Sequence, residues 1–230
     1  MATHLDLEEQ EQLDQLKAFW KKYGNLIVWT VALAMALFGG WNLWQNHQRD
    51  QAGKAGALYD EIDKSAQAGD LDKALQAFND LKERFPRTAY VQQAGLLAAK
   101  AQFEKKGQAD AAAATLTWVA DNAAEPEYKT LARLRLAGIL LDQKKYDEAL
   151  KQLDRADVKE FAPLVADRRG DVLAAQGKKD EARAAYQQAW KDMDATSEYR
   201  NLVDAKLAAM GAAPEATAAP AKNATGASAP

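Results

Sequence analysis

The chain contains few of the residues that usually carry catalytic or metal chemistry. It has 230 residues, two histidines (His4 and His47) and no cysteine. Disulfides, Fe–S clusters and thiolate nucleophiles require cysteine, and most acid–base and metal chemistry near neutral pH uses histidine. The sequence also lacks a glycine-rich phosphate loop, a Ser/His/Asp set and any metal-ligand spacing. We therefore predict a protein that is not an enzyme and that uses no cofactor or metal ion.

Charged residues form small clusters that have simple structural explanations. Asp60, Glu61 and Asp63 lie close together without an opposing acid–base partner, which is typical of a solvated helix face. The formal net charge is −3, from 30 Lys+Arg and 33 Asp+Glu. Binding to nucleic acid needs a clustered positive excess, so we predict no nucleic-acid partner.

One segment is apolar enough to cross a lipid bilayer. Residues 23–48 carry no formal charge, and residues 26–44 read LIVWTVALAMALFGGWNLW. At about 1.5 Å per residue, a helix of this length matches a hydrocarbon core of about 30 Å. Aromatic side chains that favour membrane interfaces flank the run: Trp20, Tyr23, Trp41 and Trp44. We predict a transmembrane helix over residues 23–44, with the lipid bilayer as its partner.

Two other interpretations of this segment are weaker. The buried core helix of a soluble protein needs a polar face, which this run lacks. A cleaved signal peptide is the closer rival, because Ala34-Met35-Ala36 resembles a small-x-small cleavage site. However, the region before the run is long and acidic, and the run continues past Ala36 to Trp44. These features favour an uncleaved anchor.

The flanking charges predict the orientation of the anchor. Lys21 and Lys22 stand directly before the span, and cytoplasmic flanks are enriched in such residues. We expect residues 1–22 to form a cytoplasmic stub and the bulk of the chain to be exported. The lysine and arginine counts on the two sides barely differ, so a cytosolic location of the bulk stays open as the alternative.

Small residues recur every fourth position within the span, at Ala32, Ala36 and Gly40. On a helix they form one face that another membrane helix could approach closely, so we predict a packing face there. Small residues are also common in membrane helices in general, and this explanation is equally open.

Four segments after the anchor repeat one pattern. In each segment, a small alanine precedes a large apolar residue by four positions, which places both on one helix face. The alanine lets two helices cross closely, and the large residue fills the space beside it. The pairs are Ala74 and Phe78, Ala112 and Leu116, Ala149 and Leu153, and Ala182 and Tyr186. Successive alanines are 38, 37 and 33 residues apart, which predicts an all-α domain of helical hairpins over residues 45–210.

The ends of the repeat domain have their own signals. Pro86, Pro126 and Pro163 break the chain between successive units. Residues 198–210 are amphipathic and are predicted to form the capping helix that a stack of repeats requires. Residues 211–230 are rich in Ala, Pro, Thr and Ser, and we predict a disordered tail.

The repeated pattern resembles the tetratricopeptide repeat, which has a period of about 34 residues with a glycine in its first helix, an A-x-x-x-F pair and a proline. The fourth unit matches best, with Gly170 ahead of Gly177, Ala182 and Tyr186. The resemblance implies an α-solenoid in which the first helix of each hairpin lines a concave, protein-binding groove. The groove residues that it implies are Tyr59, Leu97, Leu131, Leu134 and Asp167.

These groove residues are mostly apolar and lack the Lys and Asn residues that clamp a C-terminal carboxylate in the co-chaperone members of that family. Such a groove suits exposed hydrophobic segments of unfolded chains or a helix of a partner. Packing between helices is the alternative explanation for any single leucine among them.

Along its whole length, the chain resembles the YfgM family of ancillary subunits of the bacterial SecYEG translocon. The likeness covers residues 1 to about 210 and is carried by residues 8–11, 16–20 and 22–25 together with the repeats. It implies a single-pass protein of the bacterial inner membrane with its repeat domain in the periplasm. The partners that it implies are the SecYEG translocon, the membrane-anchored periplasmic chaperone PpiD, and unfolded or emerging client proteins. A membrane-anchored scaffold for another complex, with a cytosolic repeat domain, is the alternative function.

Overall fold

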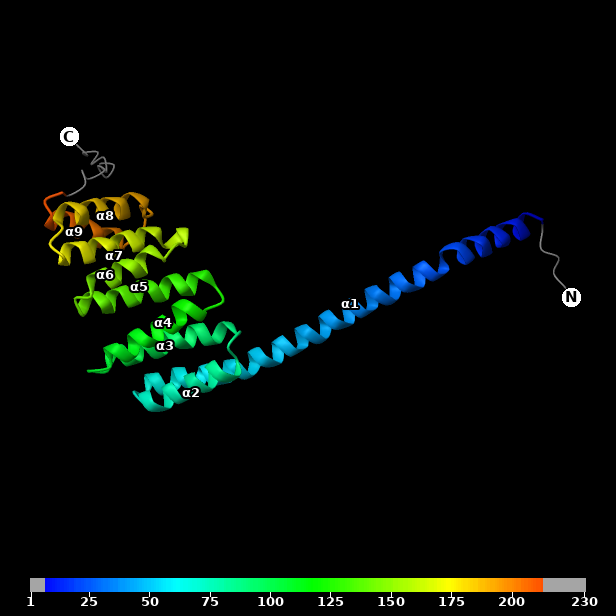
Figure 1. Ribbon diagram of the computed structural model, residues 1–230, viewed down its shortest axis with the longest axis horizontal. Coiled ribbons are helices and arrows are strands. Elements are labelled where there is room, and N and C mark those ends of the chain that lie inside the picture. Colours follow the sequence, from blue (N-terminus) through cyan, green and yellow to red (C-terminus); the bar gives the residue numbers. More distant parts are fainter. Residues whose placement is uncertain (1–6, 213–230) are drawn as a thin grey trace, which may run out of the picture. The chain divides into compact units, whose positions relative to one another are not determined.

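The computed structural model describes residues 7–212, which form helices joined by short turns (Figure 1). The helices are α1 Leu7–Gln67, α2 Leu71–Arg84, α3 Ala89–Glu104, α4 Ala109–Asn122, α5 Pro126–Asp142, α6 Tyr146–Asp154, α7 Ala162–Ala175, α8 Lys179–Asp192 and α9 Arg200–Ala209, with a 3-10 turn, η1, at Lys159–Phe161. No strand occurs within residues 7–212, which confirms the predicted all-α class. Most of the predicted disordered tail, residues 213–230, lies outside the described residues.

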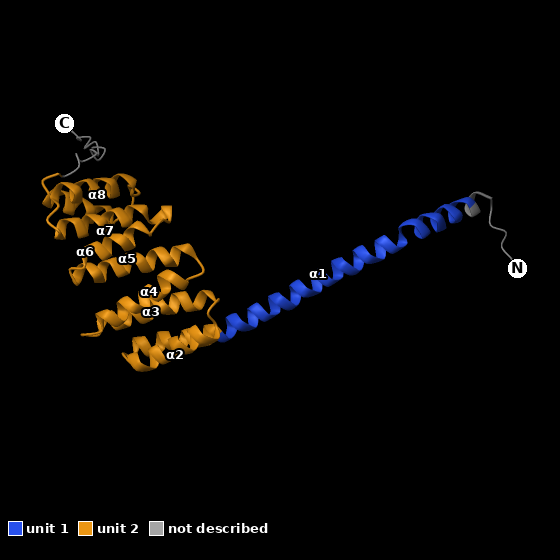
Figure 2. Cartoon of the chain, in the orientation of Figure 1, with its two compact units in different colours: residues 1–54 blue, residues 55–230 orange. Residues whose placement is uncertain are grey.

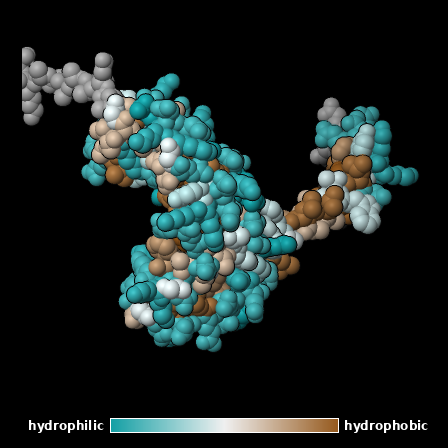
Figure 3. All heavy atoms as spheres, turned by 60° about the vertical axis from the view of Figure 1, so that its left-hand side comes forward, coloured by the Kyte–Doolittle hydropathy of each residue, from teal (hydrophilic) through white to brown (hydrophobic). Residues whose placement is uncertain are grey.

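The chain divides into two compact units, residues 1–54 and residues 55–230 (Figure 2). The first unit contains most of α1, and its large apolar side chains point outward around the helix. Trp29 is 70% exposed and Phe38 is 74% exposed. Figure 3 shows this segment as a brown, hydrophobic stretch. Among the described residues, α1 is the one helix that is long and apolar enough to cross a membrane.

Polar and aromatic groups in the first unit suit a bilayer. Thr30 donates its hydroxyl hydrogen to the carbonyl oxygen of Leu26 at 2.8 Å, so its polar group has a partner within the same helix. The rings of Phe19 and Tyr23 lie 5.1 Å apart. The rings of Trp41 and Trp44, at the other end of the apolar run, lie 5.3 Å apart. These two ring pairs bracket the run, as interfacial aromatic residues do.

The second unit is a stack of antiparallel helix pairs. Residues 55–67 of α1 pack with α2, and the pairs α3/α4, α5/α6 and α7/α8 follow, with α9 packed on α8 (Figure 1). The predicted alanines are fully buried, and their large partners are at most 3% exposed: Ala74, Phe78, Ala112, Leu116, Ala149, Leu153, Ala182 and Tyr186. The four-residue spacing of alanine and large apolar residue therefore predicted side chains that are buried within each helix pair.

Each of the four hairpins closes through a turn that contains a residue with positive φ. The value of φ is 75° at Gly69, 85° at Gly107, 60° at Lys144 and 80° at Gly177. This left-handed conformation costs about 1–2 kcal/mol for a residue with a side chain, which explains the glycine at three of the four turns. The third hairpin accepts that strain at Lys144.

Two buried polar side chains join neighbouring hairpins. Gln92 of α3 is 1% exposed, and its carbonyl oxygen accepts hydrogen bonds from the backbone N–H groups of Ala124 and Glu125, at 3.0 and 3.3 Å. Its amide group donates to the Glu125 carboxylate at 2.8 Å. Gln92 therefore caps the start of α5 from the preceding hairpin, and this fixes the register between the two units.

Arg133 of α5 makes a second joint of this kind. The residue is only 9% exposed, and its guanidinium donates to the carbonyl oxygens of Ala120 and Arg155. These carbonyls lie at the ends of α4 and α6, where helix carbonyls lack intrahelical partners. Burial lowers the pKa of Arg133 from its ordinary value.

Close packing of two helices depends on a glycine in the fourth hairpin. A Cβ atom added at Gly170 of α7 would overlap the ring of Tyr186 in α8. The partner of this close approach is a buried, hydrogen-bonded ring rather than the end of a flexible side chain.

We expect Gly170→Ala to lower the free energy of unfolding by about 1–3 kcal/mol, because the helices must separate to admit the methyl group. The matched control is Gly138→Ala in α5, where an added Cβ would lie 3.8 Å from the nearest side-chain atom. That control should be neutral or stabilising by up to about 1 kcal/mol, since alanine favours helices. Urea unfolding of both variants measures the difference, and equal effects would contradict the close-packing role of Gly170.

Candidate functional site

The predicted groove residues come from the first helix of each hairpin, but they differ in burial. Tyr59, Leu97 and Leu131 are partly buried, and each leaves some surface exposed. Tyr59 and Leu97 pack against the same core cluster, and the ring of Tyr59 lies 5.9 Å from the ring of Tyr90. Leu134, by contrast, is 8% exposed and belongs to the next core cluster. Packing between helices, the alternative stated from the sequence, is therefore the role that the structure supports for Leu134.

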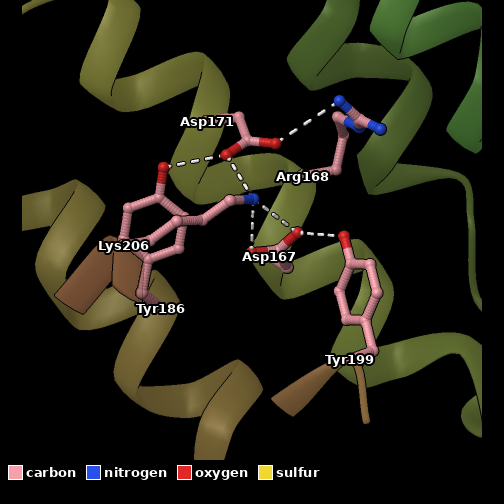
Figure 4. A network of polar contacts seen from close by, with 6 residues as sticks. All are labelled: Asp167, Arg168, Asp171, Tyr186, Tyr199 and Lys206. Carbon is pink, nitrogen blue, oxygen red and sulfur yellow. Dashed lines mark hydrogen bonds and ion pairs between the residues drawn. The ribbon is translucent and has the colours of Figure 1, made fainter. Parts of the chain in front are cut away.

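Asp167 lies in a buried polar network instead of on a surface (Figure 4). It is 1% exposed, and its two carboxylate oxygens accept three hydrogen bonds. The Tyr199 hydroxyl donates to one oxygen, and the Lys206 ammonium donates to both, all at 2.8 Å. The structure thus supports a structural role for Asp167, which holds the C-terminal helix α9 on α7.

A second carboxylate extends this network. Asp171, one turn further along α7, lies 2.7 Å from the Lys206 ammonium and 3.3 Å from the Arg168 guanidinium. The Tyr186 hydroxyl of α8 donates to Asp171 at 2.9 Å. Burial and the neighbouring Asp171 raise the pKa of Tyr186, so this phenol keeps its proton and acts as a donor. Two carboxylates face two cations, and their charges balance.

A pocket of about 310 Å³ opens between α3, α5 and α7. Its apolar floor is formed by three buried side chains, Ala99, Leu116 and Ile139. Phe103 of α3 also lines it and is 48% exposed, which is unusual for a phenylalanine in a folded domain. The pocket therefore offers an open apolar surface.

Three cations line the same pocket, one from each of three successive hairpins: Lys100, Arg135 and Arg168. Asp142 is the one acidic residue among the lining residues. Lys100 lies 3.7 Å from Glu104, and Arg168 is paired with Asp171 as described above. Arg135 donates to the carbonyl oxygen of Leu96 at 3.4 Å, and within residues 11–212 no carboxylate lies within ion-pair distance of it. Burial lowers the pKa of Arg135.

These cations were not among the predicted groove residues, which came from the tetratricopeptide resemblance. A signal was present, since Lys100, Arg135 and Arg168 are 35 and 33 residues apart, close to the repeat period. Equivalent positions in successive repeats lie side by side in a stack, so a basic residue at each position predicts a basic row.

Comparison with known proteins agrees with both resemblances. The tetratricopeptide repeat-like domain family matches residues 17–212. The chain is 37% identical over 208 residues to the ancillary SecYEG translocon subunit of Neisseria gonorrhoeae, covering 90% of this chain and 98% of that protein. The protein of the same name from Escherichia coli is 30% identical over 199 residues, 86% of this chain and 95% of its own length. The chain belongs to the family of ancillary SecYEG translocon subunits.

The YfgM-family likeness spans both units. The region that the family model matches begins before the apolar run of α1 and ends just after α9, so it contains this run as well as every hairpin. A relative from Haemophilus influenzae with the same name is 29% identical over 80% of this chain and 89% of its own length.

We expect Lys206→Met to lower the free energy of unfolding by about 2–4 kcal/mol, because it leaves two largely buried carboxylates without their shared cation. The control is Arg155→Met, which removes an ion pair to Asp121 whose side chains are 57% and 49% exposed, and it should cost at most about 1 kcal/mol.

Urea unfolding compares the two variants, and amide hydrogen exchange locates the change. Exchange in the Lys206→Met protein should accelerate in α9 before it does so in α3 or α5. Equal losses in the two variants, or unchanged protection of α9, would contradict the role of this network.

Proposed function

We propose that this chain is a non-enzymatic, membrane-anchored subunit that associates with the SecYEG translocon and binds other polypeptides through its repeat domain. The observation that carries the proposal is the match over almost the whole length of relatives that are named ancillary SecYEG translocon subunits. A tetratricopeptide repeat-like stack supports it, because such stacks present extended binding surfaces made from successive repeats.

The repeat domain in this proposal lies on the exported side of the bacterial inner membrane, in the periplasm. Lys21 and Lys22 before the apolar run support a cytoplasmic N-terminus. There the domain would work with the membrane-anchored chaperone PpiD and help to pass emerging, unfolded chains to periplasmic chaperones. Anchoring in the same membrane as the translocon raises the local concentration of a weak binding surface near its target.

Two surfaces take part in the proposal. The partly exposed groove residues Tyr59 and Leu131 would contact client segments. The anchor would dock on neighbouring membrane helices through its small residues, Ala32, Ala36 and Gly40. At Gly40, no side chain other than those of its chain neighbours lies within 4 Å of the position that a Cβ would take.

Co-purification of the full-length chain from detergent-solubilised membranes tests the proposal. We expect SecY and PpiD to be recovered with the tagged chain. Replacement of residues 23–44 by an unrelated apolar helix of equal length should remove most of the SecY, because the helix still inserts but lacks the docking face. The control lacks residues 213–230, which fall outside the family match, and should recover SecY fully.

Absence of SecY from the unmodified sample would overturn translocon association. Full SecY recovery with the replaced anchor would instead exclude the anchor as the docking element and leave the repeat domain in that role.

A further inference from the structure

We infer that the pocket between α3, α5 and α7 binds a peptide segment of another polypeptide in which a large apolar side chain lies beside a carboxylate. The inference deepens the proposed function and rests on it for the source of the segment, a client or partner polypeptide. The pocket chemistry itself comes from the residues described above.

The shape of the pocket suits one large side chain. Its volume of about 310 Å³ is at the lower end of the range for ligand sites, and its buried floor of Ala99, Leu116 and Ile139 carries no polar side-chain atom. Phe103 is 48% exposed beside this floor. An aromatic or branched side chain entering the pocket would cover the floor and the Phe103 ring together and remove both from water.

The cations of the pocket favour a carboxylate beside the apolar side chain of the bound peptide. Of its three cations, Lys100 and Arg168 have carboxylates within their own helices at 3.7 and 3.3 Å, namely Glu104 and Asp171. Arg135 stands between them without such a partner among residues 11–212. A ligand carboxylate can therefore pair with the Arg135 guanidinium, whose planar donors suit a carboxylate.

The Arg168 guanidinium of α7 lies beside α5. A Cβ added at Gly138 of α5 would be 3.8 Å from its central carbon, which is ordinary van der Waals contact, and both residues line the pocket with Arg135. The cations come from α3, α5 and α7, the first helices of three successive hairpins, and α5 contacts both of the others. This row, beside an apolar floor, fits a peptide that crosses the helices better than a compact phosphate or lipid headgroup, which would leave the floor uncovered.

Fluorescence anisotropy on the full-length chain in phosphatidylcholine nanodiscs tests the inference. The probe is a rhodamine-labelled, acetylated peptide with the core Asp-Phe-Glu between Gly-Ser flanks. Two matched peptides carry Asn-Phe-Gln or Asp-Ala-Glu. We expect each matched peptide to bind at least about tenfold more weakly, because one lacks the charge and the other lacks the apolar side chain.

Protein variants locate the binding. Arg135→Glu should lower the affinity for the Asp-Phe-Glu peptide by about tenfold. Arg135→Gln should also lower this affinity, by a smaller factor. The control is Lys179→Glu, an equal charge change at the exposed start of α8, outside the pocket, and it should leave affinity unchanged. Circular dichroism checks that each variant keeps its helices.

Three results would overturn the inference: equal affinity for the three peptides, equal losses in Arg135→Glu and Lys179→Glu, or Arg135-dependent binding to phosphatidylglycerol nanodiscs with none to the peptide. The proposed function has a separate readout, since the Arg135→Glu chain should still co-purify with SecY. Loss of SecY from the unmodified chain with intact peptide binding would remove the proposed function and leave the pocket assignment standing.

Discussion

The proposed function of this protein depends on the apolar belt of α1, residues 26–44, whose side chains need a non-aqueous environment. Side chains such as Trp29 and Phe38 expose most of their surface, and water is a poor solvent for a continuous belt of this kind. A bilayer would remove the belt from water, and its hydrocarbon core is about as thick as the apolar run is long. The backbone groups within the run need no water, because a helix pairs them internally. In the proposed function, the hairpin unit is thereby held at a membrane, where even weak binding to neighbouring proteins becomes effective.

The hairpin unit, residues 55–212, is stabilised by contacts between neighbours. Buried alanine and apolar pairs hold each hairpin, and Gln92 and Arg133 join one hairpin to the next through backbone groups at helix ends. The last hairpin lacks a following neighbour, and α9 takes that place through Lys206 and the carboxylates of α7. Arg200 adds to this contact, with its guanidinium 3.8 Å from the centre of the Trp190 ring. Such a stack leaves the groove-facing sides of its first helices available for binding.

Much of this fold was predictable because its signals are local. A charge-depleted run of bilayer length predicts a long apolar helix, and an alanine four positions before a large apolar residue identifies each hairpin. The candidate site was less predictable, because it depends on contacts across the stack. Asp167 meets Tyr199 and Lys206, which are 32 and 39 residues away, and its own helix gives no sign of them. The basic row likewise arises only when three units are aligned, since each cation alone is typical of a solvated face.

Protease accessibility in spheroplasts, followed by alkaline carbonate extraction of the membranes, tests the tethered arrangement most directly. Protease added outside spheroplasts should digest the hairpin unit and leave an N-terminal fragment of about the first 55 residues, the extent of the first unit, in the carbonate-resistant pellet. An intact chain after protease treatment would place the hairpins in the cytosol. A chain released by carbonate, or recovered in the soluble fraction without its apolar run, would contradict the membrane anchor itself.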